Sequence, residues 1–254
     1  MADAARSLLI TGASSGIGEA LARHYAAPGV ALALTGRDSD RLAAVAAACR
    51  TQGAAVESAV LDVTDRGGLG TWIERVDDGT PLDLVIANAG ISAASGRARE
   101  SEAVARRVLA VNLDGVLNTV FPVLPRFIAR RRGQIALMSS LAGFRGLPTA
   151  PAYSASKAAV KSLGEAWRVQ LAPDGIRVSV ICPGFVTTRM TARNNFAMPF
   201  LMPAERAAEI IARGLARNDG RIAFPWPMAA GAWLLGALPW RLGDAAARRA
   251  ARSG

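Results

Sequence analysis

Short apolar runs alternate with helical patterns along most of this chain, and this alternation limits the fold more than any other feature. Strands that alternate with helices build a parallel sheet, because each right-handed crossover helix packs back onto the sheet. The chain has 254 residues, is 51% hydrophobic and shows no internal repeat or low-complexity linker. We therefore predict one α/β domain, residues 1–254, with a doubly wound parallel sheet of about seven strands and helices on both faces. The apolar runs lie at residues 7–10, 30–35, 55–61, 82–87, 134–138, 177–181 and 221–224.

The first apolar run leads directly into a glycine-rich turn and then into a helical pattern. Gly12, Gly16 and Gly18 give this turn the spacing GxxxGxG. Glycines allow a backbone to approach an anion closely, and the free N–H groups at a helix start bind phosphate. The arrangement therefore predicts a nucleotide site, although an ordinary tight turn is the alternative for glycines alone. Ligands of such sheets bind at the carboxyl ends of the strands, where this sequence also places Arg37, Asp62, Asn88, Ser140 and Pro183.

The end of the second strand bears on the choice of cofactor. An acidic residue there bonds the ribose 2′-hydroxyl of NAD, whereas a nearby arginine accommodates the 2′-phosphate of NADP. This chain has Gly36 at the position of the acid and Arg37 next to it. Arginine pairs with phosphate through charge-assisted hydrogen bonds, so we predict NADP. The alternative is NAD, with Arg37 simply exposed and Asp38 in the role of the acid.

Tyr153 and Lys157 are four residues apart, so a helix places both side chains on one face. A tyrosine has a pKa of about 10, and a neighbouring positive charge lowers it, which gives a proton donor that works near neutral pH. The chain contains 30 Lys and Arg residues, but only Lys157 and Lys161 are lysines. An ammonium on a flexible stem reaches a tyrosine or a hydroxyl group more readily than a planar guanidinium does. On its own, however, this spacing also fits two residues on a solvated helix.

Taken in order, the motifs resemble those of the short-chain dehydrogenase/reductase family in its single-domain form, over about residues 7–190. Residues 11–18 resemble its TGxxxGxG motif, residues 88–90 its NAG motif and residues 183–188 its PGxVxT motif. The resemblance implies a Rossmann-type fold and hydride transfer between NADP(H) and a carbonyl or alcohol substrate. An NAD-dependent alcohol dehydrogenase of the same family and a non-catalytic dinucleotide-binding regulator are the alternatives. The family's Asn-Ser-Tyr-Lys tetrad is matched by Asn112, Ser140, Tyr153 and Lys157, with the serine 13 residues before the tyrosine.

The resemblance also implies a role for each matched residue. Tyr153 would be the general acid/base, with its pKa lowered by Lys157 and by the oxidised nicotinamide, and Lys157 would also bond the nicotinamide ribose. Ser140 would hydrogen-bond the substrate oxygen. Asn112 would distort its helix and hold a water between Lys157 and solvent. Asp62 and Val63 would contact the adenine, and no metal site is implied. The implied cofactor-binding residues are Gly12, Ser14, Ser15, Gly16, Ile17, Gly18, Arg37, Asp62, Val63, Asn88, Ala89, Gly90, Tyr153, Lys157, Pro183, Gly184, Val186 and Thr188.

Residues 185–202 are rich in methionine and phenylalanine. In the fold that the resemblance implies, this stretch lies over the substrate, so we predict it to be the substrate loop. Met-rich apolar segments form adaptable lipophilic surfaces, which indicates a lipophilic substrate. A helix packed on the core is the alternative.

Residues 226–254 form a C-terminal extension that is first apolar and then basic. Residues 222–240 carry no charge and match the length of a membrane span. Three prolines limit an unbroken helix to about residues 228–238, roughly 16 Å against a hydrocarbon core of about 30 Å. Two interpretations of the extension remain. In the one that we favour, it forms a subunit interface or covers the active site. In the other, it lies on a membrane surface as an anchor with a basic flank. Its tryptophans are Trp226, Trp233 and Trp240, and its basic flank is Arg241, Arg248, Arg249 and Arg252.

The formal net charge of +10 and the pI of about 11.1 point first to a nucleic-acid partner. The arginines are scattered through the helical patterns, however, so we predict a solvated surface and no nucleic-acid binding. We expect a small-molecule substrate and a homodimer or homotetramer. Cys49 and Cys182 match no disulfide or metal pattern, and residues 1–6 hold no signal-like apolar run. We therefore predict a cytoplasmic location, with any membrane association made through the C-terminal extension.

Overall fold

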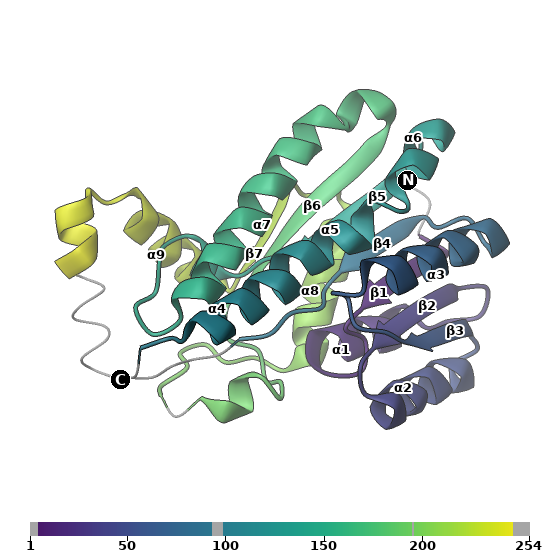
Figure 1. Cartoon of the computed structure of the whole chain (residues 1–254), viewed down its shortest axis with the longest axis horizontal. Coiled ribbons are helices and arrows are strands. Elements are labelled where there is room, and N and C mark those ends of the chain that lie inside the picture. Colours follow the sequence, from purple (N-terminus) through teal and green to yellow (C-terminus); the bar gives the residue numbers. More distant parts are fainter. Residues whose placement is uncertain (1–4, 93–98, 195, 246–254) are drawn as a thin grey trace.

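Seven parallel strands form one sheet in the computed structural model, which describes residues 5–92, 99–194 and 196–245 (Figure 1). The strand order is β3-β2-β1-β4-β5-β6-β7. The predicted strand ends differ from the observed ends by at most two residues, and the predicted fold class is confirmed. The strands are β1 (Ser7–Thr11), β2 (Ala31–Gly36), β3 (Ala55–Val60), β4 (Leu84–Ala87), β5 (Gly133–Met138), β6 (Ile176–Pro183) and β7 (Arg221–Phe224).

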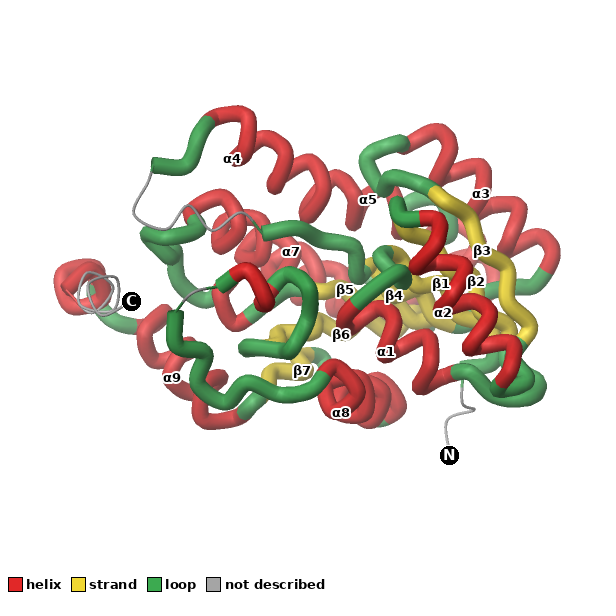
Figure 2. Tube along the Cα trace, turned by 90° about the horizontal axis from the view of Figure 1, so that it is seen from below, coloured by secondary structure: helices red, strands yellow, loops and turns green. Residues whose placement is uncertain are grey.

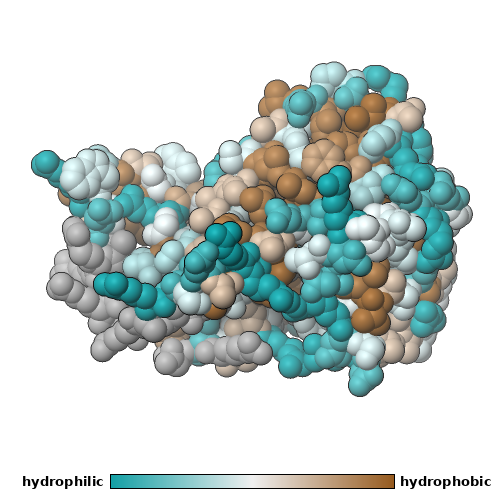
Figure 3. Space-filling model, in the orientation of Figure 1, coloured by the Kyte–Doolittle hydropathy of each residue, from teal (hydrophilic) through white to brown (hydrophobic). Residues whose placement is uncertain are grey.

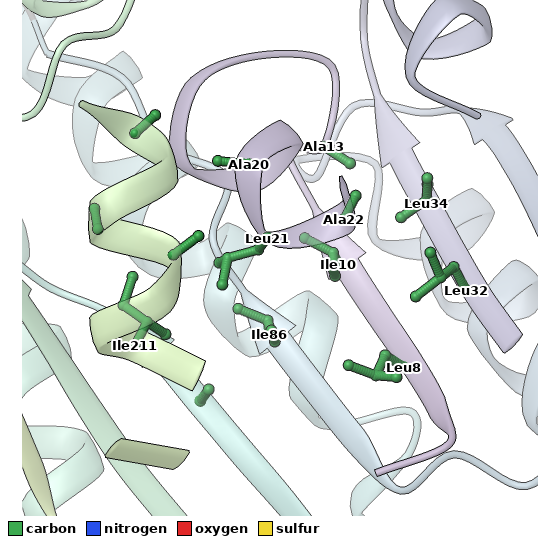
Figure 4. Close-up of a cluster of buried hydrophobic side chains, with 14 of the residues drawn as sticks. Leu8, Ile10, Ala13, Ala20, Leu21, Ala22, Leu32, Leu34, Ile86 and Ile211 are labelled. Atoms are coloured by element: carbon green, nitrogen blue, oxygen red, sulfur yellow. The ribbon is translucent and has the colours of Figure 1, made fainter. Parts of the chain in front are cut away.

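Helices cover both faces of this sheet. Side chains alternate along each strand, so Leu8 and Ile10 of β1 face one set of helices and Leu9 faces the other. Figure 4 shows Leu21 and Ile211 packed over the strands from the first set. Each fully buried leucine or isoleucine contributes about 1.5–3 kcal/mol by leaving water. The first set is α1 (Gly16–Tyr25), α2 (Ser39–Thr51) and α8 (Ala204–Ala216). The second is α3 (Arg66–Gly79), α5 (Gly115–Val120), α6 (Leu124–Arg130) and α7 (Pro151–Gln170), with α4 (Glu102–Leu109) beside α7.

The chain reverses its direction across the sheet between β1 and β4. From β1 it moves outward through β2 to β3, and it then returns to β4, which pairs with the other side of β1. At this reversal Asn88 Nδ2 donates to the Thr11 carbonyl oxygen at 2.9 Å, which ties the carboxyl ends of the two strands together. Ligands bind in the crevice at such a switch point, so the topology places the candidate site at this edge.

The helical region between β4 and β5 is divided into several pieces. α4 continues through a π-helical turn, Ala110–Asp114, into α5. The helix then stops before α6, where Pro122 offers no N–H to continue it. The run Glu102–Arg130 is long and apolar enough to cross a membrane, judged by length and composition only. Its contacts with α3 and α7 account for that apolar character.

The C-terminal helix α9 (Trp226–Ala237) begins two residues earlier than predicted. A proline is tolerated in the first turn of a helix, because its missing N–H has no helical partner there, so Pro227 does not stop α9. On its inner side, Met228 and Ala232 pack against the buried cluster of Leu141, Val180 and Cys182. Part of the predicted basic flank lies outside the described residues, namely Arg248, Arg249 and Arg252.

Candidate active site

A cavity of about 500 Å³ opens at the carboxyl ends of the strands, beside β1 and β4. Every residue predicted from the motifs lines this cavity except Gly18 and Asn112, which are buried behind its wall. The fold therefore brings together residues that are far apart in the sequence. The cavity wall also contains residues that the motifs do not indicate, among them Arg41, Ile91, Val111, Met138, Ser139 and Met190.

The glycine-rich turn forms one side of the cavity. Gly12 and Gly16 have left-handed backbones, with φ of +68° and +60°, which L side chains rarely adopt. At Gly18 the constraint is space, because a Cβ would lie 2.3 Å from the Gly12 carbonyl oxygen. Among the described residues, the side chain of Ser15 makes no capping hydrogen bond to the first turn of α1. The N–H groups at this helix start therefore remain available to an anion, and the turn fits a dinucleotide pyrophosphate.

Two arginines and two aspartates lie at the β2 end of the cavity. Asp38 caps α2, since its carboxylate accepts the Arg41 N–H at 3.0 Å and pairs with Arg41 Nη1 at 2.6 Å. Arg37 Nη1 lies 3.6 Å from Asp62 Oδ2. Burial raises the pKa of Asp62, but hydrogen bonds from Thr64 and the neighbouring arginine charges outweigh burial and hold this pKa below its usual range. Arg41 belongs to none of the motifs, although its place in the first turn after Asp38 is a signal that the sequence contains.

Tyr153, Lys157 and Ser140 meet at the other end of the cavity. α7 carries Tyr153 and Lys157 one turn apart, and Ser140 follows the end of β5. Lys157 Nζ lies 5.8 Å from the centre of the Tyr153 ring and donates to the Met138 carbonyl oxygen at 2.8 Å. Ser139 Oγ donates to the Lys157 carbonyl oxygen at 2.7 Å. Two hydrogen bonds thus hold α7 against β5 at the lysine.

The pKa of Tyr153 is raised in this structure, and the lowering predicted from Lys157 together with the oxidised nicotinamide stays a prediction. Burial raises the pKa of Tyr153 above its ordinary value, and a hydrogen bond with Ser140 lowers it only in part. Burial also lowers the pKa of Lys157 to about 8, so its positive charge begins to be lost just above neutral pH. The physical reason is that both groups are withdrawn from water, which acts against the charged form of each.

Asn112 is buried at the centre of the π-helical turn. Its Oδ1 accepts the Ile91 N–H at 2.8 Å, and its Nδ2 donates to the Ile91 carbonyl oxygen and to Ser156 Oγ, both at 3.0 Å. Ser156 Oγ in turn donates to the Tyr153 carbonyl oxygen at 2.7 Å. The helix is therefore distorted at Asn112 as predicted, and this side chain links the loop after β4 to the helix of the tyrosine. The water predicted beside Asn112 stays a prediction.

Replacing Ser156 by Ala should destabilise the protein. The change leaves the buried Asn112 Nδ2 without one acceptor and removes the bond to Tyr153, which should lower the free energy of unfolding by about 1–3 kcal/mol. Urea unfolding measures this difference. Ser39→Ala is the control, because the Ser39 hydroxyl is exposed. Equal unfolding midpoints for the two variants would contradict the proposed importance of this network.

The loop after β6 closes over the glycine-rich turn. The Thr187 N–H donates to the Met202 carbonyl oxygen at 2.8 Å, so the two ends of the predicted substrate loop, 185–202, lie side by side. A Cβ at Gly16 would lie 2.9 Å from Thr188 Cγ2. The loop thus begins and ends beside the cavity, and Figure 2 shows it in green between β6 and α8.

The comparison with known proteins agrees with this geometry. A family model described as short chain dehydrogenase matches residues 6–198, which is well over half of the chain. The chain belongs to the short-chain dehydrogenase family. A relative from Myxococcus xanthus, named an uncharacterized oxidoreductase, is 42% identical over 245 residues, which cover 96% of this short-chain dehydrogenase and 97% of the relative.

Two solved structures share the fold of this short-chain dehydrogenase. A short-chain dehydrogenase from Sphingobium yanoikuyae in complex with NADPH is 28% identical, with a TM-score of 0.80 over 92% of this chain and 96% of that one. A short chain dehydrogenase from Mycobacterium paratuberculosis bound to NAD is 27% identical, with a TM-score of 0.76 over 86% of this chain and 94% of that one. This chain is accordingly an NAD(P)-dependent oxidoreductase. Membership of the family does not distinguish NADP from NAD as the cofactor, because the first of these structures holds NADPH and the second holds NAD.

Proposed function

We propose that this short-chain dehydrogenase transfers a hydride between NADP(H) and the carbonyl or alcohol group of a lipophilic substrate. The observation that carries the proposal is the placement of Tyr153 and Ser140 together on the cavity wall, with the buried Lys157 beside them. Carbonyl reduction needs a proton donor and hydrogen-bond donors at the oxygen where negative charge develops. A bound nicotinamide supplies the hydride.

Each of these side chains has a defined task in the proposal. The Tyr153 hydroxyl holds the proton that moves to or from the substrate oxygen. Ser140 hydrogen-bonds this phenol, so a substrate oxygen beside one hydroxyl is within reach of the other. Lys157 is held by the Met138 carbonyl oxygen, and its ammonium favours the phenolate that forms when the proton leaves. Asn112 positions α7 through Ser156, and the water predicted beside it would link Lys157 to solvent.

The charges at the β2 end of the cavity support NADP over NAD. Asp38 uses its carboxylate for the Arg41 N–H and the Arg41 guanidinium, so this acid is engaged rather than offered to a ribose hydroxyl. The Arg37 side chain is half exposed at the cavity. Arg41 Nε is buried and has no hydrogen-bond partner within the described part of the chain. A 2′-phosphate bound between the two arginines would form charge-assisted hydrogen bonds with both.

Arg37→Ala should weaken NADPH binding by about tenfold or more and leave NADH binding nearly unchanged, because only NADPH carries the 2′-phosphate. A titration of cofactor-free protein with each nucleotide, followed by nucleotide fluorescence, measures both affinities. Arg206→Ala is the matched control, since Arg206 is an exposed arginine of α8 that pairs with Glu209. Tighter binding of NADH than of NADPH by the unaltered protein would overturn the NADP assignment.

The substrate loop supports a lipophilic substrate. Met190 lines the cavity, and Phe196, Phe200 and Leu201 of the same loop are exposed. The Phe196 ring also contacts Phe185 edge-on, with 5.9 Å between the ring centres. Exposed apolar side chains that gather beside a pocket mark a contact with a ligand or partner. An apolar substrate that extends from the cavity over this loop would cover them.

A second copy of this chain is the proposed macromolecular partner, as a homodimer or homotetramer in the cytoplasm. Leu109, Phe121, Ile128 and Val169 are large apolar side chains exposed on the adjoining helical segments from α4 to α7. Phe121 contacts Trp167 edge-on across α5 and α7, with 5.8 Å between the ring centres. Figure 3 shows hydrophobic surface, in brown, over these helices. Contact between two copies would remove this surface from water.

A further inference from the structure

The C-terminal helix α9 and the residues after it present an apolar surface that the proposed reaction does not use. Trp226, Trp233 and Trp240 are 77%, 60% and 68% exposed. Leu234 and Leu242 are also more than half exposed. We call these five residues the tryptophan surface. Tryptophans are costly to leave in water, so a surface of this kind marks a contact that the isolated chain does not show.

The tryptophan surface projects from the body of the protein. α9 follows β7 at the carboxyl edge of the sheet, where the cavity also opens. Figure 1 shows a further helical turn after α9, in yellow, that extends beyond the other helices. The inner side of α9 packs on the body through Met228 and Ala232. The outer side carries Trp233 and Leu234. A helix that is apolar on both sides is typical of one that is buried in protein or in lipid.

The charges around the tryptophan surface are basic. Residues 222–240 carry no charge, and the Arg241 guanidinium lies 5.1 Å from the centre of the Trp240 ring. Asp244, the acid that follows, is paired with Arg145 at 2.7 Å. In the sequence, residues 245–254 add three arginines and no acid. An anionic surface would therefore be attracted to this end of the protein without facing an unpaired carboxylate.

We propose that α9 and the residues after it, up to 245, anchor the protein to the surface of a membrane that contains anionic lipids. Tryptophan is enriched at the boundary between membrane and water, and basic residues beside a membrane-contacting segment are attracted to anionic lipids. The 12 residues of α9 span about 18 Å, which is too short for a hydrocarbon core of about 30 Å. In this proposal α9 therefore lies on the membrane surface and does not itself cross the membrane.

A second copy of the chain suits the tryptophan surface less well than a membrane does. The helical face with Phe121 and Val169 already offers an apolar contact between copies. The last described helical turn, which carries Trp240 and Leu242, extends from the body in Figure 1, whereas a stable protein interface needs about 800 Å² of closely fitting surface on each partner. The structure thus favours the anchor over a subunit interface. The other role predicted for the extension, a cover over the active site, stays a prediction.

The anchor also places the cavity beside the membrane. Gly184 lines the cavity, and a Cβ at Gly184 would lie 3.2 Å from Met228 Sδ of α9. A lipophilic substrate dissolved in the bilayer would then reach the cavity over a short path. This consequence rests on the proposed function, whereas the anchor itself does not, because membrane binding needs no turnover.

Sedimentation with lipid vesicles tests the anchor. The full-length protein should sediment with vesicles of phosphatidylglycerol and phosphatidylcholine, sediment less with phosphatidylcholine alone, and be released by salt. The double variant Trp233→Ser/Trp240→Ser should lose about tenfold or more in partition coefficient. Val60→Ser is the matched control and should sediment like the unaltered protein, since Val60 is an exposed apolar residue of the opposite edge strand β3.

Tryptophan fluorescence gives a second measurement that needs no variant. Three of the five tryptophans belong to the tryptophan surface, so anionic vesicles should shift the emission of the unaltered protein to shorter wavelength. NADPH binding by the double variant reports whether it folds, because Trp233 and Trp240 lie outside the cavity wall. Equal sedimentation of the double variant and the unaltered protein would overturn the anchor. A double variant that dissociates in gel filtration while its vesicle binding is unchanged would show instead that a second copy covers this surface.

Discussion

Replacing Tyr153 by Phe should lower the turnover of carbonyl substrates by about 10²–10⁴-fold, because the reaction loses its positioned proton donor. The change removes one hydroxyl and keeps the ring in place on α7. Nucleotide affinity should stay nearly unchanged, since the glycine-rich turn and Arg37 lie at the other end of the cavity. The measurement is NADPH oxidation with a panel of lipophilic aldehydes and ketones, beside a fluorescence titration with NADPH.

Tyr25→Phe is the matched control for this experiment. It removes the hydroxyl of the other tyrosine in the chain, which lies at the end of α1 and not in the cavity wall. Unchanged turnover in Tyr153→Phe would contradict the role assigned to the phenol. If the unaltered protein binds NADPH but reduces none of the panel, the result would match the alternative of a non-catalytic dinucleotide-binding regulator.

Replacing Asp77 by Asn should lower the free energy of unfolding by about 2–3 kcal/mol. The Asp77 side chain is fully buried and accepts from Arg130 Nη1 at 2.6 Å, from Arg130 Nη2 at 2.9 Å and from the Leu82 N–H at 2.9 Å. Asparagine keeps the shape of this side chain but leaves the guanidinium without its charge partner. The Arg130 side chain is 31% exposed, so water compensates in part, and the effect should stay below the roughly 3–5 kcal/mol typical of a fully buried pair.

The effect of Asp77→Asn should depend on pH. Burial raises the pKa of Asp77, but hydrogen bonds from Arg130 and Leu82 and the charge of Arg126 outweigh burial and lower this pKa. A carboxyl group whose folded pKa lies below its unfolded value of about 3.9 stabilises the protein above that pH. This contribution is lost as the pH falls through the folded pKa. The stability difference between the unaltered protein and the variant should therefore be full near neutral pH and shrink below about pH 4.

Urea unfolding of both proteins across this pH range measures the effect. Asp78→Asn is the matched control, because Asp78 is the next residue and is 65% exposed, although it also pairs with an arginine, Arg126. Exposed ion pairs contribute about 0–1 kcal/mol, so this control should be close to neutral. An Asp77→Asn effect that is no larger than the control, or that stays constant as the pH falls, would contradict the assignment.

The strands and the position of the cavity could be predicted because they depend on local order. Each strand is a short apolar run between turn residues, and helical patterns between such runs leave a parallel sheet as the outcome. The carboxyl ends of parallel strands share one edge, so Gly12, Asn88 and Ser140 meet there although they are distant in the sequence. α9 shows the limit of a local rule, since Pro227 lies in the first turn of this helix although it was expected to exclude it.

The electrostatic state of the site could not be predicted in the same way. The spacing of Tyr153 and Lys157 shows that the two side chains share a face, but burial by distant segments sets the direction of both pKa shifts. The contact of Asn112 with Ser156 joins residues 44 positions apart, and the Asp77–Arg130 pair joins residues 53 positions apart. Neither pair leaves a periodic pattern in the sequence.

The sequence by itself determined the parallel sheet, the family and the chemical groups that the cavity contains, because periodicity and the order of motifs record them. Only the tertiary structure decided which of those groups are withdrawn from water, which acid is already engaged beside Arg37, and which side of α9 faces outward. The physical reason is that burial and pairing are properties of segments brought together by folding, and a residue's neighbours along the chain do not specify them.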